Sequence, residues 1–203
     1  MKAGAIALES RRERTPPAPN PQLMPSGVLG MLLFVFTECM LFAGLISAHW
    51  VVRAGTNLPW PPPDQPRLPQ IATVLNSGVL LFSGGALLLA HLAFRRGGAR
   101  AAEARTPMLV AALAGAFFVA FQGFEWVRLV AQGLTLTSSP YGSFFYVIVG
   151  THALHAVGAI LALLWAYGRL VAGRLTANQL YTVEVFWYFV VLVWPFIFLR
   201  VYL

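Results

Sequence analysis

Six side chains with ionisable or amide groups lie inside long apolar segments of this chain. They are Glu38, Gln122, Glu125, His152, His155 and Glu184. A charged side chain at the centre of a bilayer costs roughly 3 kcal/mol on insertion scales, so such residues are candidates for a functional site. Carboxylates and imidazoles can share protons, hydrogen-bond one another or ligate a metal ion. These six residues are therefore the first places to look for chemistry.

Their positions along the segments predict that most of them lie at similar depth. A helical rise of about 1.5 Å per residue places Glu38, the Gln122–Glu125 pair and the two histidines near the middle of three different segments. His152 and His155 are three residues apart and share a helix face. The shared depth predicts one buried polar network across three helices. Separate hydrogen bonds between neighbouring helices are the alternative.

The same residues do not form a recognisable metal or haem site. Di-iron bundles place Glu-x-x-His motifs on facing helices, whereas this chain has His-x-x-His with no carboxylate at that spacing. Two imidazoles on one helix cannot ligate opposite faces of a haem. We therefore predict that the chain binds no metal, haem or other redox cofactor and has no catalytic residues.

Three ionisable residues, one of which belongs to this set of six, have simpler interpretations. His49 and His91 lie near the ends of their segments, which predicts an interfacial position rather than a catalytic one. Glu184 lies near the start of the last segment, where a carboxylate complements the positive end of the helix dipole.

Composition excludes a soluble globular domain. Hydrophobic residues make up 58% of the 203 residues and charged residues 10%, with a mean hydropathy of +0.70. The net charge of +7 does not indicate nucleic-acid binding, because the Lys and Arg side chains lie in the N-terminal tail and the short connections. The single cysteine, Cys39, excludes an internal disulfide. We expect no cleaved targeting peptide.

Five apolar segments are long enough to cross a membrane as helices. They cover about 26–51, 71–94, 108–131, 142–167 and 179–202, and they are separated by proline-rich, glycine-rich or charged connections. Backbone in lipid must satisfy its own hydrogen bonds, so these spans must be helical. The sequence predicts an all-α, polytopic membrane protein: a polar tail at 1–25 and one five-helix bundle at 26–203.

The distribution of positive charge predicts the orientation. Ten of the 14 basic residues lie in the tail, the second connection and the fourth connection, and four lie on the other side. Because cytoplasmic loops carry the excess of Lys and Arg, we predict an N-in, C-out topology with a cytoplasmic tail.

Read as strings, the segments resemble subunit III of the haem–copper oxidases over about residues 25–203. GMLLFVFTECMLFAGL (30–45) is similar to the stretch that holds the family's buried carboxylate, which would be Glu38. LPQIATVLNSGVLLFSGG (68–85) resembles the following helix, and FQGFEW (121–126) resembles a Gln-x-x-Glu-Tyr/Trp segment. YGSFFYVIVGTHALHAVGAI (141–160) resembles Tyr-Gly-Ser-x-Phe followed by Gly-x-His-Gly-x-His-Val. The ending FWYFVVLVWPFIFLRVYL is similar to Trp-His-Phe-Val-Asp-x-Val-Trp.

Three departures from the family pattern point to a divergent branch. Tyr188 stands where the family has His, Val191 where it has Asp, and Ala153 where Gly is usual. The resemblance therefore implies a reduced polar network at the last helix. The five-span length resembles the short bacterial form.

The resemblance implies an accessory role in a respiratory terminal oxidase of the bacterial inner membrane. In that family haem and copper lie in catalytic subunit I, which oxidises cytochrome c or quinol and reduces oxygen to water. The resemblance implies that this chain packs on subunit I, with subunit II in the same complex, and stabilises it during proton-pumping turnover. It also implies structural phospholipid in a cleft between the first two helices and the rest, with Glu38 facing that cleft.

Two other functions remain open at this point. One is the related accessory membrane protein of nitric oxide reductase, which shares the five-helix layout. The other is a small transporter or proton channel working alone, although transporters usually show repeated halves and broken helices, which the sequence lacks.

Overall fold

The computed structural model describes residues 26–57 and 59–203, apart from the side chains of 99–101. Every regular element within these residues is a helix. The five long helices are α2 (Ser26–Gly55), α3 (Gln70–Arg95), α4 (Arg105–Ala131), α5 (Pro140–Val171) and α6 (Ala177–Ile197). A 3₁₀ helix, η1 (Gly98–Ala104), precedes α4, and a π-helical turn, η2 (Phe198–Tyr202), follows α6. All five helices are long and apolar enough to span a membrane, which confirms the predicted fold class. The predicted tail at 1–25 lies outside the described residues.

Local capping signals set where the helices begin and end. Ser139 accepts a hydrogen bond from the Gly142 amide ahead of α5, whose first residue is Pro140. Thr176 and Gln179 form a reciprocal capping box that starts α6. Because the Ser139 cap lies ahead of the apolar residues, α5 begins at Pro140, before the predicted start at 142, and it ends at Val171, past the predicted end at 167.

Four of the helices form a close-packed bundle. α3 packs along α4, α4 along α5, and α5 along α6, with α6 also touching α3. Aromatic and aliphatic side chains from all four are fully enclosed there; they include Leu87, Met108, Phe118, Phe145, Leu163, Leu180, Trp187 and Trp194. A bundle of this kind is held in lipid by close packing rather than by exclusion of water.

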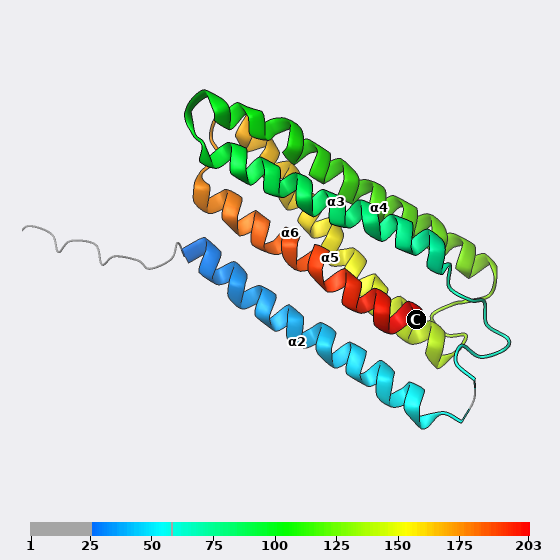
Figure 1. Ribbon diagram of the computed structural model, residues 1–203. Helices are drawn as coiled ribbons and strands as arrows, with labels where there is room; N and C mark the ends of the chain where they lie inside the picture. The colour runs from blue at the N-terminus through cyan, green and yellow to red at the C-terminus, as the bar shows by residue number, and fades with distance from the viewer. Residues whose placement is uncertain (1–25, 58) are drawn as a thin grey trace, which may run out of the picture.

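α2 lies beside this bundle rather than in it (Figure 1). It contacts α6 and, less extensively, α5. Of its 30 residues, only Phe42 and His49 are buried, so α2 is attached along a narrow stripe. This differs from the cleft that the resemblance implied, because the second helix, α3, is part of the bundle and only α2 is set apart.

The helices alternate in direction, so α2 begins at one end of the molecule and the chain ends at the other (Figure 1). Connections 56–69 and 132–139 lie at the end where the chain terminates, and 96–104 and 172–176 lie at the opposite end. The basic residues of the second and fourth connections therefore lie at the end where α2 starts.

Candidate functional site

The central polar contact joins α2 to α5. His155 Nε2 lies 3.0 Å from Glu38 Oε2, and His155 Nδ1 lies 2.7 Å from the Thr151 carbonyl oxygen. Because a carbonyl oxygen only accepts, Nδ1 carries hydrogen and donates to it. Nε2 then either accepts a proton from a protonated Glu38 or donates one to its carboxylate. The contact therefore holds one shared proton, as a neutral pair or as an ion pair.

Aromatic rings enclose this pair. Phe42 of α2 lies edge-on to His155 at 5.6 Å between ring centroids, and Phe189 and Phe186 of α6 lie at 5.9 and 6.3 Å. Both members are mostly covered, with side-chain exposures of 12% for His155 and 17% for Glu38. The apolar shell strengthens the electrostatic interaction between the two groups relative to water.

His152, one turn earlier on α5, has a different environment. It is 1% exposed and packs against Trp194 of α6 at 4.9 Å and edge-on to Phe118 of α4 at 6.2 Å. Neither of its ring nitrogens has a hydrogen-bond partner among the described residues. Although His152 and His155 both touch Phe42, the structure gives them separate polar surroundings.

Gln122 and Glu125 of α4 take part in contacts of their own. Gln122 Nε2 donates to the Tyr202 hydroxyl at 2.6 Å, and Gln70 Nε2 of α3 donates to the Tyr202 carbonyl oxygen at 2.8 Å. These two bonds tie the end of the chain to α3 and α4. Glu125 lies 3.4 Å from Arg128 one turn along the same helix.

Glu184 pairs with His91 across α6 and α3. Glu184 Oε2 and His91 Nδ1 are 2.8 Å apart, and the Glu184 side chain is only 7% exposed. The prediction that Glu184 complements the dipole of α6 is therefore wrong. α6 starts seven residues earlier, so Glu184 lies beyond its first turn, and the carboxylate is held by a specific partner. His91, four residues before the end of α3, is that partner.

His49, near the end of α2, is packed inside the protein. It is 1% exposed and packs edge-on against Trp60 of the first connection and Phe144 of α5. The connection therefore folds back over the end of α2. The apolar pattern of the spans does not predict this contact.

The hydrogen bonds thus divide the predicted site residues into separate groups instead of one network. Glu38 and His155 join α2 to α5, Glu184 and His91 join α6 to α3, and Gln122 joins α4 to Tyr202. Helical rise fixes the depth of a residue but not the direction in which its helix turns it. Tyr202 is not among the predicted site residues, because its partner Gln122 lies 80 residues away in the chain and only the packing of the helices brings the two together.

Two of the three positions that depart from the family pattern, Tyr188 and Val191, are packed against α3. The Tyr188 hydroxyl lies 3.4 Å from the Gly84 carbonyl oxygen, and Val191 fits against Gly84, where a Cβ atom would lie 3.3 Å from its methyl group. Tyr188 therefore keeps a polar link from the last helix, while Val191 replaces a polar link with close packing.

The donor atoms of these residues do not fit a redox metal. Over the described residues, no three His, Cys, Asp or Glu side chains converge. The imidazole and carboxylate groups that do meet are each occupied by one another, as in the Glu38–His155 and Glu184–His91 pairs. Haem, copper and iron each need a larger ligand set or an open imidazole facing a cofactor-sized cavity.

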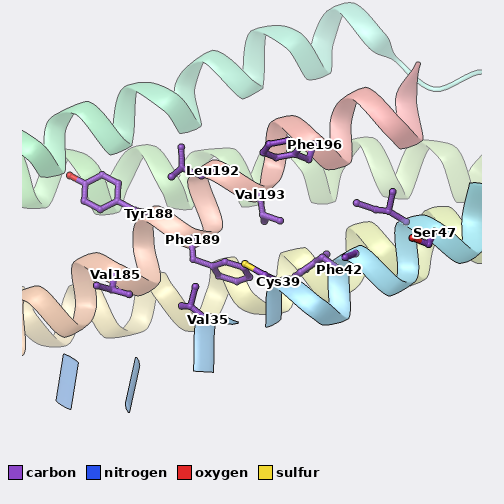
Figure 2. A pocket seen from close by; sticks show the side chains of 12 residues that line it. Val35, Cys39, Phe42, Ser47, Val185, Tyr188, Phe189, Leu192, Val193 and Phe196 are labelled. Atoms are coloured by element: carbon purple, nitrogen blue, oxygen red, sulfur yellow. The ribbon is translucent and has the colours of Figure 1, made fainter. Parts of the chain in front are cut away.

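A long apolar groove separates α2 from α6 (Figure 2). Its volume is about 720 Å³. Its walls are Val35, Cys39, Phe42, Ala43, Ile46 and Ser47 of α2, and Val185, Tyr188, Phe189, Leu192, Val193 and Phe196 of α6. A second groove of about 400 Å³ lies between α3 and α6, with Tyr188 and Leu192 shared and the Glu184–His91 pair in its wall. Phe42 separates the first groove from the two α5 histidines.

Comparisons with known proteins agree with this arrangement. A family model of cytochrome c oxidase subunit III matches residues 20–203. A probable cytochrome c oxidase subunit 3 of Nocardia farcinica is 34% identical over 178 residues, which are 86% of this chain and 86% of that protein. The corresponding protein of Mycobacterium leprae is 32% identical with the same coverage. Cytochrome c oxidase subunit 3 of Loxodonta africana is 30% identical over 90% of this chain and 71% of its own length. With five membrane-spanning helices and these matches along nearly its whole length, the chain belongs to the cytochrome c oxidase subunit III family and is a subunit III of a respiratory oxidase.

Proposed function

We propose that this chain is an accessory subunit with no redox centre, packed against the haem- and copper-containing subunit I of a bacterial inner-membrane oxidase that also holds subunit II. The observation that supports this proposal is that buried imidazole and carboxylate groups are paired with one another. Each imidazole or carboxylate that meets another group across helices is engaged in a one-to-one contact. Such pairs stabilise helix contacts in lipid but leave no ligand set for electron transfer.

The groove between α2 and α6 supports the proposal that the subunit holds structural phospholipid. Its walls are almost entirely hydrocarbon, and it runs along the helices, as an acyl chain does in a bilayer. A volume of about 720 Å³ far exceeds that of a single side chain and leaves room for a lipid acyl chain. A chain lying there would fill the space between α2 and the bundle, so α2 and lipid would be held together.

Its main contribution is endurance of the complex during turnover. A helical bundle with bound lipid covers one flank of the catalytic subunit and excludes water from it. The Glu38–His155 pair, which shares one proton, lies behind this groove and links α2 to the bundle. Loss of the subunit would expose the flank, and inactivation would accumulate with each turnover.

The test compares oxidase prepared with and without this chain. We expect unchanged haem spectra, largely preserved initial oxygen consumption and faster inactivation during sustained turnover in its absence. Mass spectrometry of lipids retained by the two preparations should show fewer bound phospholipids without the chain. Immediate loss of haem or of all initial activity would contradict an accessory role.

Mild detergent extraction identifies the complex itself. We expect the chain to co-purify with oxidase subunits I and II. Co-purification with nitric oxide reductase subunits, or isolation as a chain without any haem-containing partner, would replace the proposal by one of the two alternatives named from the sequence.

The N-in, C-out orientation is the remaining element of this proposal. The end of the bundle that carries Arg95, Arg96, Arg105, Arg169 and Arg174 would face the cytoplasm. Reporter fusions at Gly98 and Ser138 should report opposite sides, with Gly98 inside. The reverse result, or the same side for both, would contradict it.

A further inference from the structure

A trough runs along α6 on the side that faces α3. Its inner part is the second groove of about 400 Å³, and a further space of about 500 Å³ continues it to the end of α3. His91, Glu184 and Tyr188 line both parts, so the two form one α3–α6 trough. Its other walls include Leu81, Gly85, Leu88 and Arg95 of α3, and Tyr181 and Leu192 of α6.

The α3–α6 trough is about as long as one leaflet of a bilayer is thick. Arg95 is the last residue of α3, and Leu81 lies fourteen residues before it, about 21 Å by helical rise. The hydrocarbon core of a bilayer is about 30 Å thick, so its middle lies about 15 Å from either edge. Leu81, Leu88 and Leu192 line the inner part, and each is at least 48% exposed. The trough therefore offers a hydrocarbon surface from the membrane edge to the middle of the bilayer.

The outer end of the trough carries hydrogen-bond donors. Arg95 is exposed there, and His91 lies one turn earlier on α3 with 22% of its side chain exposed. Glu184 Oε2 lies 2.8 Å from His91 Nδ1, so His91 Nε2 is the nitrogen left for a ligand. Because burial disfavours a net charge on this pair, the pair keeps one shared proton and Nε2 carries a hydrogen. Two donors therefore lie about one helical turn apart.

The charge at this end of the trough selects an anion. Glu184 is balanced by His91, whereas no carboxylate among the described residues lies within ion-pair distance of Arg95. Arg96 follows and adds a second positive charge beside the trough. A guanidinium group binds two phosphate oxygens at once, and its charge repels the ammonium group of a zwitterionic headgroup.

We propose that the α3–α6 trough binds one anionic phospholipid of the leaflet nearest the second and fourth connections. Arg95 and His91 Nε2 bind its phosphate, and one acyl chain lies along Leu88 and Leu192. Tyr181 packs against His91 at 5.4 Å between ring centroids and holds the imidazole at the edge of the trough. The α2 groove differs, because the described residues of its walls include no cationic side chain. The site is therefore selective for headgroup charge and independent of the lipid proposed for the α2 groove.

Photolabelling of the intact oxidase complex with lipid probes tests this proposal. The complex is reconstituted in vesicles of equal amounts of phosphatidylglycerol and phosphatidylcholine, with a trace of either lipid carrying the same diazirine acyl chain. Mass spectrometry locates the labelled residues. We expect Leu81 and Leu88 to take up severalfold more phosphatidylglycerol probe than phosphatidylcholine probe. Equal labelling would mean an apolar surface without headgroup recognition, and no labelling by either probe would mean a surface covered by a partner; each result would overturn the proposal.

Two neighbouring arginines separate a binding site from general attraction to a basic surface. Arg95→Gln removes the charge that lines the trough, and Arg96→Gln removes the same charge from an exposed residue that does not line it. The preference for phosphatidylglycerol at Leu81 and Leu88 should fall severalfold in Arg95→Gln and stay unchanged in Arg96→Gln. An equal fall in both variants, or no fall in either, would contradict a specific site.

Two glycines of α3 test the path of the acyl chain. A Cβ atom at Gly85 or at Gly78 meets nothing within 4 Å, and only Gly85 lines the trough. Gly85→Leu should lower labelling of Leu88 by the phosphatidylglycerol probe severalfold, and Gly78→Leu should leave it unchanged. The same labelling in both variants would refute an acyl chain in the trough. If Gly85→Leu does not assemble, the two arginine variants decide.

Labelling of the α2 groove reports separately on the lipid proposed there. Val35 and Ile46 line only that groove, so the two probes should label them equally, and Arg95→Gln should not change their labelling. An unlabelled α2 groove beside a selectively labelled α3–α6 trough would refute the lipid in the α2 groove and support the site at Arg95. A fall at Val35 and Ile46 in Arg95→Gln would show that the two sites are not separate and would overturn the proposal.

Discussion

The bundle of α3–α6 and the attachment of α2 differ in how they hold together. In the bundle, α6 buries nine of its 21 residues, and Trp187 and Trp194 fill the space between helices. α2 buries two of its 30 and is otherwise bordered by a groove. The bundle depends on close packing at many points, whereas α2 depends mainly on Phe42, His49, the Glu38–His155 pair and whatever occupies the groove. Changes in the bundle should therefore unfold the whole subunit, and changes at α2 should loosen α2 alone.

The largest effect is expected from crowding the bundle at Gly115 of α4. A Cβ atom there would lie 2.4 Å from the Trp187 ring, which is enclosed on all sides and cannot retreat. Gly115→Ala should cost about 3 kcal/mol, at the upper end for overpacking, and lower the amount of assembled subunit. Immunoblotting of membranes and of purified complex measures this.

Gly123 on the same helix is the matched control for that change. A Cβ atom at Gly123 meets nothing within 4 Å, so Gly123→Ala should accumulate like the unmodified chain. Equal loss in both variants would show that α4 tolerates no added methyl group for reasons other than Trp187.

Removing the anchor of α2 should have the next largest effect. Phe42 is 1% exposed and touches His152, His155 and Phe189. Lipid is as apolar as this site, so Phe42→Ala loses mainly the cavity contribution, about 2 kcal/mol. Hydrogen exchange should rise in α2 and stay unchanged in α4. Phe36→Ala, at an exposed position of the same helix, is the control. Equal loss of protection in α2 and α4 would contradict a separate attachment.

A smaller effect is expected from the polar pair behind Phe42. Glu38→Ala leaves His155 Nε2 without a partner, at a cost of about 1–2 kcal/mol. It should speed inactivation during turnover without changing the initial rate. Glu38→Gln separates two causes, because its amide donates to the same Nε2 but cannot share a proton. If Gln behaves like Glu, the hydrogen bond matters; if it behaves like Ala, proton sharing matters.

The two regions also differ in how far the sequence predicted them. Apolar length, prolines and glycines determined the number of helices and nearly all of their boundaries, because those signals are local. The partners of the buried polar residues were not predicted, because they depend on helix rotation. Glu184 and His91 are far apart in the chain, and only the packing of α6 on α3 brings them within 2.8 Å. The separation of α2 from the bundle likewise has no local signal.

The smallest effect is expected at the end of α2 farthest from Ser26. The Arg200 guanidinium lies 4.8 Å from the centre of the Trp50 ring and joins the end of the chain to α2. Trp50 is half exposed, so the contact is worth about 0.5–1 kcal/mol. Arg200→Gln should raise hydrogen exchange only in the last turns of α2, whereas Arg200→Lys, which keeps the charge, should retain part of the protection. Arg169→Gln is the control, because its cation–π partner is Trp165 on its own helix and α2 is not involved. If hydrogen exchange in Arg200→Gln rose along α2 as far as Phe42, the Trp50–Arg200 contact would be as important for the attachment of α2 as its buried residues.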